Sequence, residues 1–433
     1  MVKLIMPIQD EPGESIIQPK DLLEVKNYGT IMEYLEFRDK TYWERVGVGG
    51  SFTANPIEHG GIIYVGCCDK NFYAIDAETG REVWRFPTKG MVQAHALCKD
   101  GLVFFGSADR NFYCLDSKTG ELVWKYETNG PVRNGPAEHK GMILVGSDDG
   151  CLYALKAGDG SFLWKFMTSY PMTMPLIIDE KIYCGYESCS FYCLSLKGEL
   201  LWKFNTNAWI AAWPAAYDNG TIYFGSADKN LYALSKDGRL KWKFPASDIV
   251  LCPSAENSRV YFGCADKNIY CLDSAGKKIW SLKTNEPVGD MTISGNVLYM
   301  GCYDRNLYAV EKTTRKVLWK FPTDGFVHCV PLIYGNTVIF GSWDCNLYCL
   351  DKTTGSLVWK FHSSLSTQSE IAPPEKVEIK KLGVVKPEED EKKDKKYVSG
   401  RSAEYEANIT TYTGGISKAY LSSRKKGYVE IQE

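Results

Sequence analysis

Tryptophan recurs through most of the chain at a nearly constant interval. Eight tryptophans follow one another at spacings of 38 to 40 residues, and the surrounding text repeats with them. Two copies read "FGSADRNFYCLDSKTGELVWKY" over 105–126 and "FGSWDCNLYCLDKTTGSLVWKF" over 340–361. A repeat of this length is typical of propellers, solenoids and other arrays. The tryptophans are Trp84, Trp124, Trp164, Trp202, Trp242, Trp280, Trp319 and Trp359.

The pattern inside each copy is that of short β-strands. A run such as "IIYVG" is followed by a polar turn, an alternating run such as "NLYAL", a second turn, and a run that holds the tryptophan. Apolar residues alternate with a period of two and show no helical period. A short fourth stretch completes each copy. The sequence therefore predicts an all-β fold, an eight-bladed β-propeller of four-stranded antiparallel blades, with an N-terminal extension and a C-terminal tail.

The shared text Gly-Ser-x-Asp-x-Asn-x-Tyr-x-Leu-Asp-x-x-Thr-Gly-x-x-x-Trp resembles the PQQ-like (quinoprotein-type) propeller repeat, over roughly residues 49–361. The resemblance implies that each tryptophan docks across a blade interface onto the backbone of the next sheet. Quinoprotein dehydrogenases of this fold add a quinone, a calcium ion and, in some, a vicinal disulfide. This chain has minimal blades and, in the segments that line the expected channel, no dense carboxylate cluster for calcium. We therefore expect a non-enzymatic member without a cofactor.

The repeats divide the chain into four parts. We expect an N-terminal extension over 1–41, the propeller over 42–362, a linker rich in Pro, Lys and Glu over 363–396, and a segment with recurring tyrosines over 397–433. The last part is either a weakly structured tail or a module that docks onto a partner or onto the ring. Trp43 keeps the repeat register, and forms either an outer strand that joins the first blade to the last or an N-terminal lid.

Charge and apolar runs limit the partners and the compartment. Lys and Arg number 51 against 53 Asp and Glu, a formal net charge of −2, so nothing in the whole-chain charge favours nucleic acid. No apolar run is long enough to cross a bilayer, and the first residues lack the apolar core of a signal peptide. We expect a cytoplasmic protein whose 15 cysteines are thiols.

One turn of each blade carries recurring polar residues. Asp occupies the same position in seven blades and Asn, two residues later, in six, as is typical of side chains that bond the turn backbone and tolerate left-handed geometry. A cation lies between them in five blades. These cations form either a solvated rim largely offset by the adjacent aspartates, or a surface for an acidic partner. They are Lys70, Arg110, Lys229, Lys267 and Arg305.

The cysteines fit positions of the repeat. Cys114 and three others alternate with alanine at one position, which calls for a small buried residue. The vicinal pair Cys67-Cys68 places one cysteine in the serine position of the turn, so a turn is favoured over a redox device. Cys184, Cys189 and Cys193 are spaced too unevenly for a zinc knuckle.

The segments that enter the innermost strands vary from blade to blade. Because they line the expected mouth of the central channel, their polar residues either face a wet channel without a purpose or bind a ligand or partner. A metal site of His95 or His328 with Cys329 is a further alternative. The candidates are Thr53, Gln93, His95, Arg133, Asn134, Thr173, Trp209, Trp213, Asp290 and His328.

Together these features predict a non-catalytic scaffold that presents the upper face and channel mouth of the propeller to a partner protein. The chain contains no P-loop, no HExxH and no G-x-S-x-G motif, and the "GVGGS" at 47–51 precedes a strand, not a helix. The alternative is a small-molecule or cofactor binder, or an oxidoreductase, that uses the channel mouth. Binding to nucleic acid and a membrane span are not expected.

Overall fold

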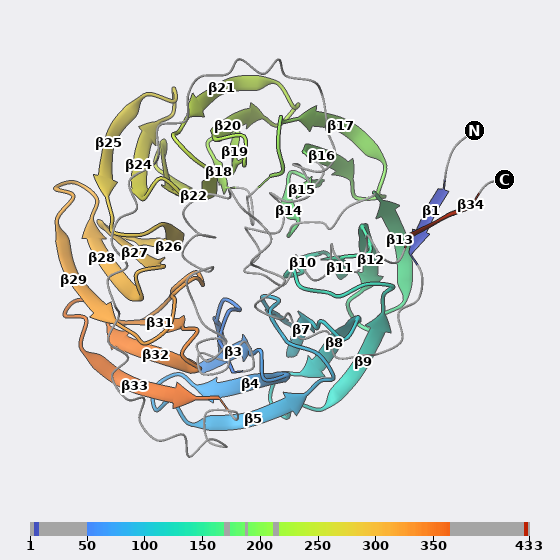
Figure 1. Cartoon of the computed structure of the whole chain (residues 1–433). Helices are drawn as coiled ribbons and strands as arrows, with labels where there is room; N and C mark the ends of the chain where they lie inside the picture. The colour runs from blue at the N-terminus through green and yellow to red at the C-terminus, as the bar shows by residue number, and fades with distance from the viewer. Residues whose placement is uncertain are drawn as a thin grey trace.

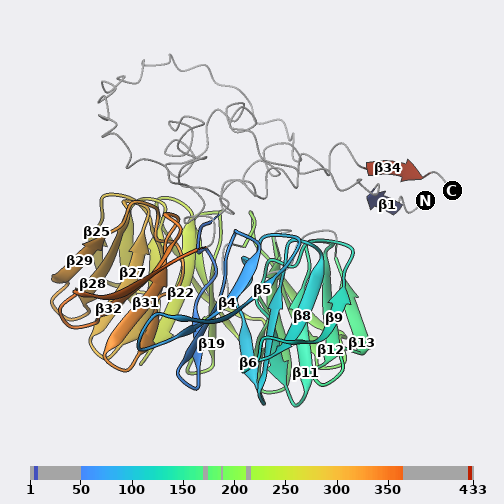
Figure 2. The same cartoon turned by 90° about the horizontal axis from the view of Figure 1, so that it is seen from below.

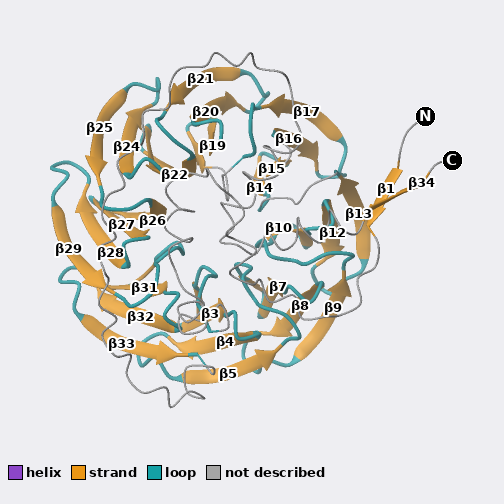
Figure 3. Cartoon of the chain, in the orientation of Figure 1, coloured by secondary structure: helices purple, strands orange, loops and turns teal. Residues whose placement is uncertain are grey.

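The computed structural model describes residues 4–7, 50–168, 174–186, 189–210, 216–363 and 428–431. Between residues 50 and 363, eight four-stranded antiparallel sheets stand radially as the blades of a ring (Figures 1 and 3). Each blade takes four consecutive strands, so blade 1 is β2–β5 and blade 8 is β30–β33. All described elements are strands, and none of the described residues forms a helix able to cross a membrane. The predicted eight-bladed propeller is confirmed.

The strands run between the two faces of the ring (Figure 2). We call one face of the ring the upper face: it carries the turn between the second and third strands of every blade. Because the strands are antiparallel, the segments that lead from one blade into the next lie on the same face. The innermost strands are β2 (Ile57–His59), β6 (Leu97–Lys99), β10 (Ala137–His139), β14 (Leu176–Ile178), β18 (Ala216–Asp218), β22 (Val250–Glu256), β26 (Val288–Ser294) and β30 (Leu332–Tyr334). The second strands are β3 (Ile62–Gly66), β7 (Leu102–Gly106), β11 (Met142–Gly146), β15 (Lys181–Tyr186), β19 (Thr221–Gly225), β23 (Arg259–Cys264), β27 (Val297–Cys302) and β31 (Thr337–Gly341).

The two remaining strands of each blade lie further from the axis. The third strands are β4 (Asn71–Asp76), β8 (Asn111–Asp116), β12 (Cys151–Lys156), β16 (Ser190–Ser195), β20 (Asn230–Ser235), β24 (Asn268–Asp273), β28 (Asn306–Glu311) and β32 (Asn346–Asp351). The outer strands are β5 (Glu82–Pro87), β9 (Leu122–Glu127), β13 (Phe162–Met167), β17 (Leu200–Asn205), β21 (Leu240–Pro245), β25 (Lys278–Lys283), β29 (Val317–Pro322) and β33 (Leu357–His362). Separately, β1 (Leu4–Pro7) pairs antiparallel with β34 (Tyr428–Ile431).

A small residue in the third strand faces each tryptophan across the ladder. Ala74 pairs with Trp84, Cys114 pairs with Trp124, and both small side chains are fully buried. In all eight blades the register shifts directly after this pair. A bulge at that point increases the local twist of the outer strand, and a larger side chain there would collide with the indole. This is why Ala and Cys alternate at the position.

Seven of the eight tryptophans dock onto the next blade. The Trp84 indole donates from Nε1 to the Ser117 carbonyl oxygen at 3.1 Å. The ring of blades closes in the same way, because Trp359 of blade 8 donates to the Ala77 carbonyl oxygen of blade 1 at 3.0 Å. Trp280 differs: its buried Nε1 has no hydrogen-bond partner among the described residues. The other acceptors are Ala157, Leu196, Lys236, Ser274 and Lys352.

Among the described residues, the ring closes through contacts between blades 1 and 8, all of them after residue 50. The backbone N–H of Phe52 donates to the Ser342 carbonyl oxygen at 3.1 Å, and blades 1 and 8 share one hydrophobic cluster. None of the eight described sheets contains a fifth strand. Trp43, with its two proposed roles, lies outside the described residues, as do most of the N-terminal extension, of the linker and of the C-terminal segment.

Candidate functional site

Seven of the eight upper-face turns are built around an aspartate that bonds within its own blade. In blade 2, Asp109 Oδ1 accepts the Asn111 backbone N–H at 3.0 Å, and Oδ2 accepts the Tyr113 hydroxyl at 2.8 Å. The Asn111 amide returns a bond to the Asp109 carbonyl oxygen at 3.1 Å. The aspartates and asparagines therefore hold the turn, as the recurrence of both residue types indicated.

The left-handed residue of the turn lies between the aspartate and the asparagine. The φ angle is 71° at Lys70 and 72° at Arg110. The Asp side chain bonds the backbone two residues ahead, and this reversal requires the intervening residue to turn left-handed. The same conformation occurs at Gly150, Cys189, Lys229, Lys267, Arg305 and Cys345.

The left-handed turns project cations from the upper face. Lys70, Arg110 and Lys229 are exposed, and none of the five cations pairs with the aspartate of its own turn. Lys229 Nζ lies 3.8 Å from Asp248, and Lys267 Nζ lies 3.1 Å from Glu286. Lys70, Arg110 and Arg305 make no ion pair with the described residues. We refer to these three as the upper-face cations.

The vicinal cysteines occupy ordinary positions of this turn. Cys67 Sγ donates to the Gly50 carbonyl oxygen at 3.1 Å, the same bond that Ser107 Oγ makes to Gly90 at 3.2 Å in blade 2. Both thiols are buried, and burial raises the pKa of Cys67 well above its usual value and that of Cys68 to about 12. All 15 cysteines are free thiols. The pair is therefore a protonated part of the turn.

The predicted mouth residues differ in burial and partners. Thr53 and Gln93 are half-buried, and Asn134 and Trp209 are buried. The half-buried Arg133 forms an ion pair with Asp148. Two candidates, Thr173 and Trp213, lie outside the described residues.

His95 is held by a residue that the sequence reasoning missed. The Asn55 side chain of blade 1 donates from Nδ2 to His95 Nδ1 of blade 2 at 3.2 Å, and its Oδ1 accepts the Val330 N–H of blade 8 at 2.8 Å. Asn55 thus joins three blades. Burial, with a smaller contribution from His328, lowers the pKa of His95 to about 4. His95 is therefore neutral near pH 7.

A second group gathers where blades 6, 7 and 8 meet. Cys252 and Asp290 occupy the same position in adjacent innermost strands, between ladder pairs where the register shifts. Asp290 is buried, which raises the pKa of its carboxyl, while His328 and a hydrogen bond from Cys252 act in the opposite direction. The His328 ring lies 5.4 Å from that of Tyr303. Cys252 and Tyr303 were missed because they replace apolar or variable residues.

These side chains do not assemble into a metal centre. Within the described parts of the chain, no group of three or more His, Cys, Asp or Glu side chains is placed to hold a metal ion. Cys329, the thiol considered as a ligand beside a histidine, accepts the Gly341 N–H at 3.1 Å. The mouth presents polar side chains that include the buried His95, Asn134 and Asp290.

Removing the imidazole of His95 should change the acid stability of the fold. In the unfolded chain His95 titrates near pH 6.5, whereas its pKa in the folded protein is about 4. Protons therefore bind the unfolded state first, and stability falls as the pH decreases from about 6.5 to 4, by about 3 kcal/mol in total. For His95→Gln we expect a shallower loss over this interval in urea denaturation. The exposed His59→Gln variant is the control, and parallel curves for wild type and His95→Gln would contradict the assignment.

The chain is similar to known propellers in sequence and in structure. The sequence model of the family described as beta-alanine-activating enzyme, beta-propeller, matches residues 28–256. That of the PQQ-type family described as outer membrane protein assembly factor BamB matches residues 265–385. The resemblance to PQQ-like repeats is thereby confirmed. No match was found among curated proteins.

Solved structures agree on the fold. A computationally designed protein, Ika8, superposes with a TM-score of 0.63 at 17% identity, covering 70% of this chain and 96% of its own. BamB from Moraxella catarrhalis superposes with a TM-score of 0.60 at 13% identity, covering 69% and 96%. At these identities the likeness shows the propeller architecture alone.

Proposed function

Because this chain belongs to the beta-propeller family described for the beta-alanine-activating enzyme, we propose that it is a non-catalytic scaffold whose upper face binds an acidic surface of a partner protein. The activity in the family description is that of the named enzyme. A partly matching family is described as an assembly factor, which favours a role in assembling proteins. The cytoplasmic location expected from the sequence is part of the proposal.

The proposal is supported by a difference between the negative and the positive side chains of the upper-face turns. The aspartate carboxylates accept hydrogen bonds from tyrosine hydroxyls and turn amides, as Asp109 does from Tyr113 and Asn111. In five of the seven turns built around an aspartate, a cation with a left-handed backbone follows the aspartate and makes no ion pair with it. A rigid face that projects cations from several blades is complementary to an acidic protein surface, and such complementarity gives association rate and specificity.

A specific observation also supports a second function, binding of a small molecule at the mouth. Asp290 is a buried carboxyl of raised pKa with an imidazole and a thiol nearby, and such groups cluster at functional sites. A bound molecule would be detected by native mass spectrometry of the purified protein. A species released on denaturation, and absent from Asp290→Asn, would favour this function over the scaffold.

Reversing the upper-face cations should abolish partner binding. We expect the triple variant Lys70→Glu, Arg110→Glu, Arg305→Glu to lose its co-purified partner in quantitative mass spectrometry, because the like charges now repel an acidic surface. Each position keeps a side chain that can adopt the left-handed backbone already present, so the turns should remain folded. Wild-type binding should also weaken as salt is raised.

The control carries the same change of charge on the outer strands. Lys125→Glu, Lys203→Glu, Lys360→Glu alters three exposed lysines on the outer strands β9, β17 and β33, outside the upper-face turns, and we expect it to retain the partner. Equal loss in both variants would indicate a nonspecific charge effect. Full retention by the upper-face variant would exclude the proposed surface.

A further inference from the structure

The interface between blades 6 and 7 lacks an aromatic ring that every other interface contains. Elsewhere the residue two after the docking tryptophan is Phe or Tyr, and its ring packs against a third-strand tyrosine of the next blade. In blade 6 this residue is Leu282, so Tyr308 of blade 7 has no such ring. The seven pairs are Phe86–Tyr113, Tyr126–Tyr153, Phe166–Tyr192, Phe204–Tyr232, Phe244–Tyr270, Phe321–Tyr348 and Phe361–Tyr73, with centroids 5.2 to 5.7 Å apart.

A cavity of about 350 Å³ lies at the position of the missing ring. Leu282 and Tyr308 both line it, and its remaining apolar wall comes from the cores of the two blades. Its charged lining residues are two exposed lysines, Lys283 and Lys320. The cavity is therefore an apolar space with a cationic border. The other apolar lining residues are Ile269, Met300, Val310 and Val317.

The same interface also differs from the other seven at the position on which the tryptophan packs. In seven blades the tryptophan packs on a turn glycine of the next blade, as Trp84 does on Gly120. Blade 7 has Arg315 there, with the positive φ of 64° retained. Trp280 is nevertheless buried in the cluster that blades 6 and 7 share, and its Nε1 has no hydrogen-bond partner among the described residues. This interface therefore lacks the docking hydrogen bond that the other seven contain.

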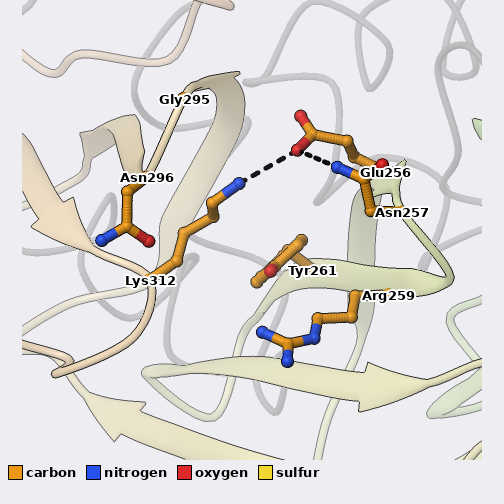
Figure 4. Close-up of a pocket in the computed structure, with 7 residues that line it drawn as sticks. All are labelled: Glu256, Asn257, Arg259, Tyr261, Gly295, Asn296 and Lys312. Carbon is orange, nitrogen blue, oxygen red and sulfur yellow. Dashed lines mark hydrogen bonds and ion pairs between the residues drawn. The ribbon is translucent and has the colours of Figure 1, made fainter.

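A second cavity, of about 470 Å³, opens between the lower-face hairpins of these two blades. Figure 4 shows the Lys312 ammonium directed at the Glu256 carboxylate, 3.1 Å away. The same ammonium lies 5.8 Å above the Tyr261 ring, and Arg259 also lines the space. Both cavities thus belong to one interface.

At the position after the tryptophan, the outer strand of blade 6 lacks the charge that the other outer strands carry there, although β25 has Lys278 and Lys283 at its two ends. β25 pairs with β24 alone among the described strands, so its outward edge presents unpaired backbone groups. The exposed residue directly after each tryptophan is Lys or Arg in seven blades and Ser281 in blade 6. Lysine at such a position blocks the addition of a further strand. The seven are Arg85, Lys125, Lys165, Lys203, Lys243, Lys320 and Lys360.

We propose that β25 and the adjoining 350 Å³ cavity form a docking site for an extended peptide segment of a partner protein. The segment adds as a fifth strand to the edge of β25, and one aromatic side chain enters the cavity. There its ring packs edge-on against Tyr308, as the native ring does in the other seven interfaces. Acidic residues on either side of the aromatic one face Lys283 and Lys320.

Each part of this occupant follows from a separate observation. The unpaired edge of β25 calls for an extended backbone. The vacant ring position calls for an aromatic side chain, and the cationic border calls for acidic residues on either side of it. The site lies on the outer strand, so it does not require the upper-face cations and is independent of the function proposed above. A small aromatic molecule could fill the cavity but would leave the strand edge unused, and the two occupants are distinguishable.

The test is a selection of random peptides displayed on phage against the full chain. We expect enriched peptides to share one Phe or Tyr within an alternating segment flanked by Asp or Glu. Hydrogen exchange should show protection of the β25 amides when a selected peptide is bound. Leu282→Phe restores the native ring and fills the cavity, and Ser281→Lys restores the protecting charge. Each should weaken the binding of a selected peptide about tenfold or more.

These two variants give blade 6 the residues that the other blades have at the same positions, so they should fold. Leu282→Phe should melt at a higher temperature than wild type. Lys243→Ser in blade 5 is the matched control: it removes the protecting lysine where Phe244 still fills the interface, and should neither gain a site nor lose the one on β25. No shared motif, binding unaffected by Leu282→Phe, or binding without protection of β25 would each overturn the proposal. The last would point to a ligand of the cavity alone.

Discussion

Replacing Trp124 with alanine is expected to lower the free energy of unfolding by about 3–5 kcal/mol, the usual cost of truncating a packed indole. The indole donates to the Ala157 carbonyl oxygen of the next blade at 3.0 Å, and its ring is 5.8 Å from Phe104 and 5.9 Å from Phe112. The truncation therefore removes a hydrogen bond and opens a cavity between blades 2 and 3. Equilibrium denaturation in guanidinium chloride measures the change.

Trp280→Ala is the matched control for this prediction. Trp280 is buried in the core between blades 6 and 7 but makes no docking hydrogen bond among the described residues and meets Arg315 in place of a glycine. We expect its truncation to cost less than that of Trp124, by about the 1 kcal/mol attributable to one hydrogen bond. An equal or larger loss for Trp280→Ala would show that docking contributes little to the stability of the ring.

Gly120→Ala is expected to destabilise the protein by about 3 kcal/mol, through two effects at one site. Gly120 has φ of +73°, a conformation that costs an L-residue about 1–2 kcal/mol. A Cβ there would also lie 2.6 Å from Cδ2 of Trp84, so the docked indole must move. A thermal melt compares the variant with wild type.

Gly101→Ala separates the two effects. Gly101 has nearly the same backbone, with φ of +79°, but a Cβ at that position meets nothing within 4 Å. We expect Gly101→Ala to lower the free energy of unfolding by the backbone cost alone, about 1 kcal/mol. If Gly101→Ala and Gly120→Ala were equally destabilising, contact with the indole would not be the reason for glycine at position 120.

The fold was predictable because its signal is repeated eight times. Strand number, strand order and the small residue opposite each tryptophan can all be read from period-two alternation and from comparison of the copies. The sequence did not place the left-handed residue of the turn, because Asp and Asn tolerate that conformation themselves, whereas here it falls on Lys70 and its counterparts between them. Residue preference alone does not distinguish these two cases.

The candidate site was harder to predict because its contacts cross between blades. Asn55 touches His95 of the next blade and Val330 of the last one, residues 40 and 275 positions away. Cys252 reads as an apolar filler until the register shift places it beside Asp290. By contrast, Ser281, Leu282 and Arg315 could have been found by comparing the outer strands and turns of the copies. Only the structure shows that these three residues lie at one interface.

Zero-length carbodiimide cross-linking of the protein to its co-purified partner tests the account most directly, since this reagent joins lysine amines to carboxylates in contact. The account predicts links from Lys70 and Lys229 of the upper face to Asp or Glu of the partner. Links to the partner that start from outer-strand lysines such as Lys125 and Lys203, with none from the upper face, would contradict it.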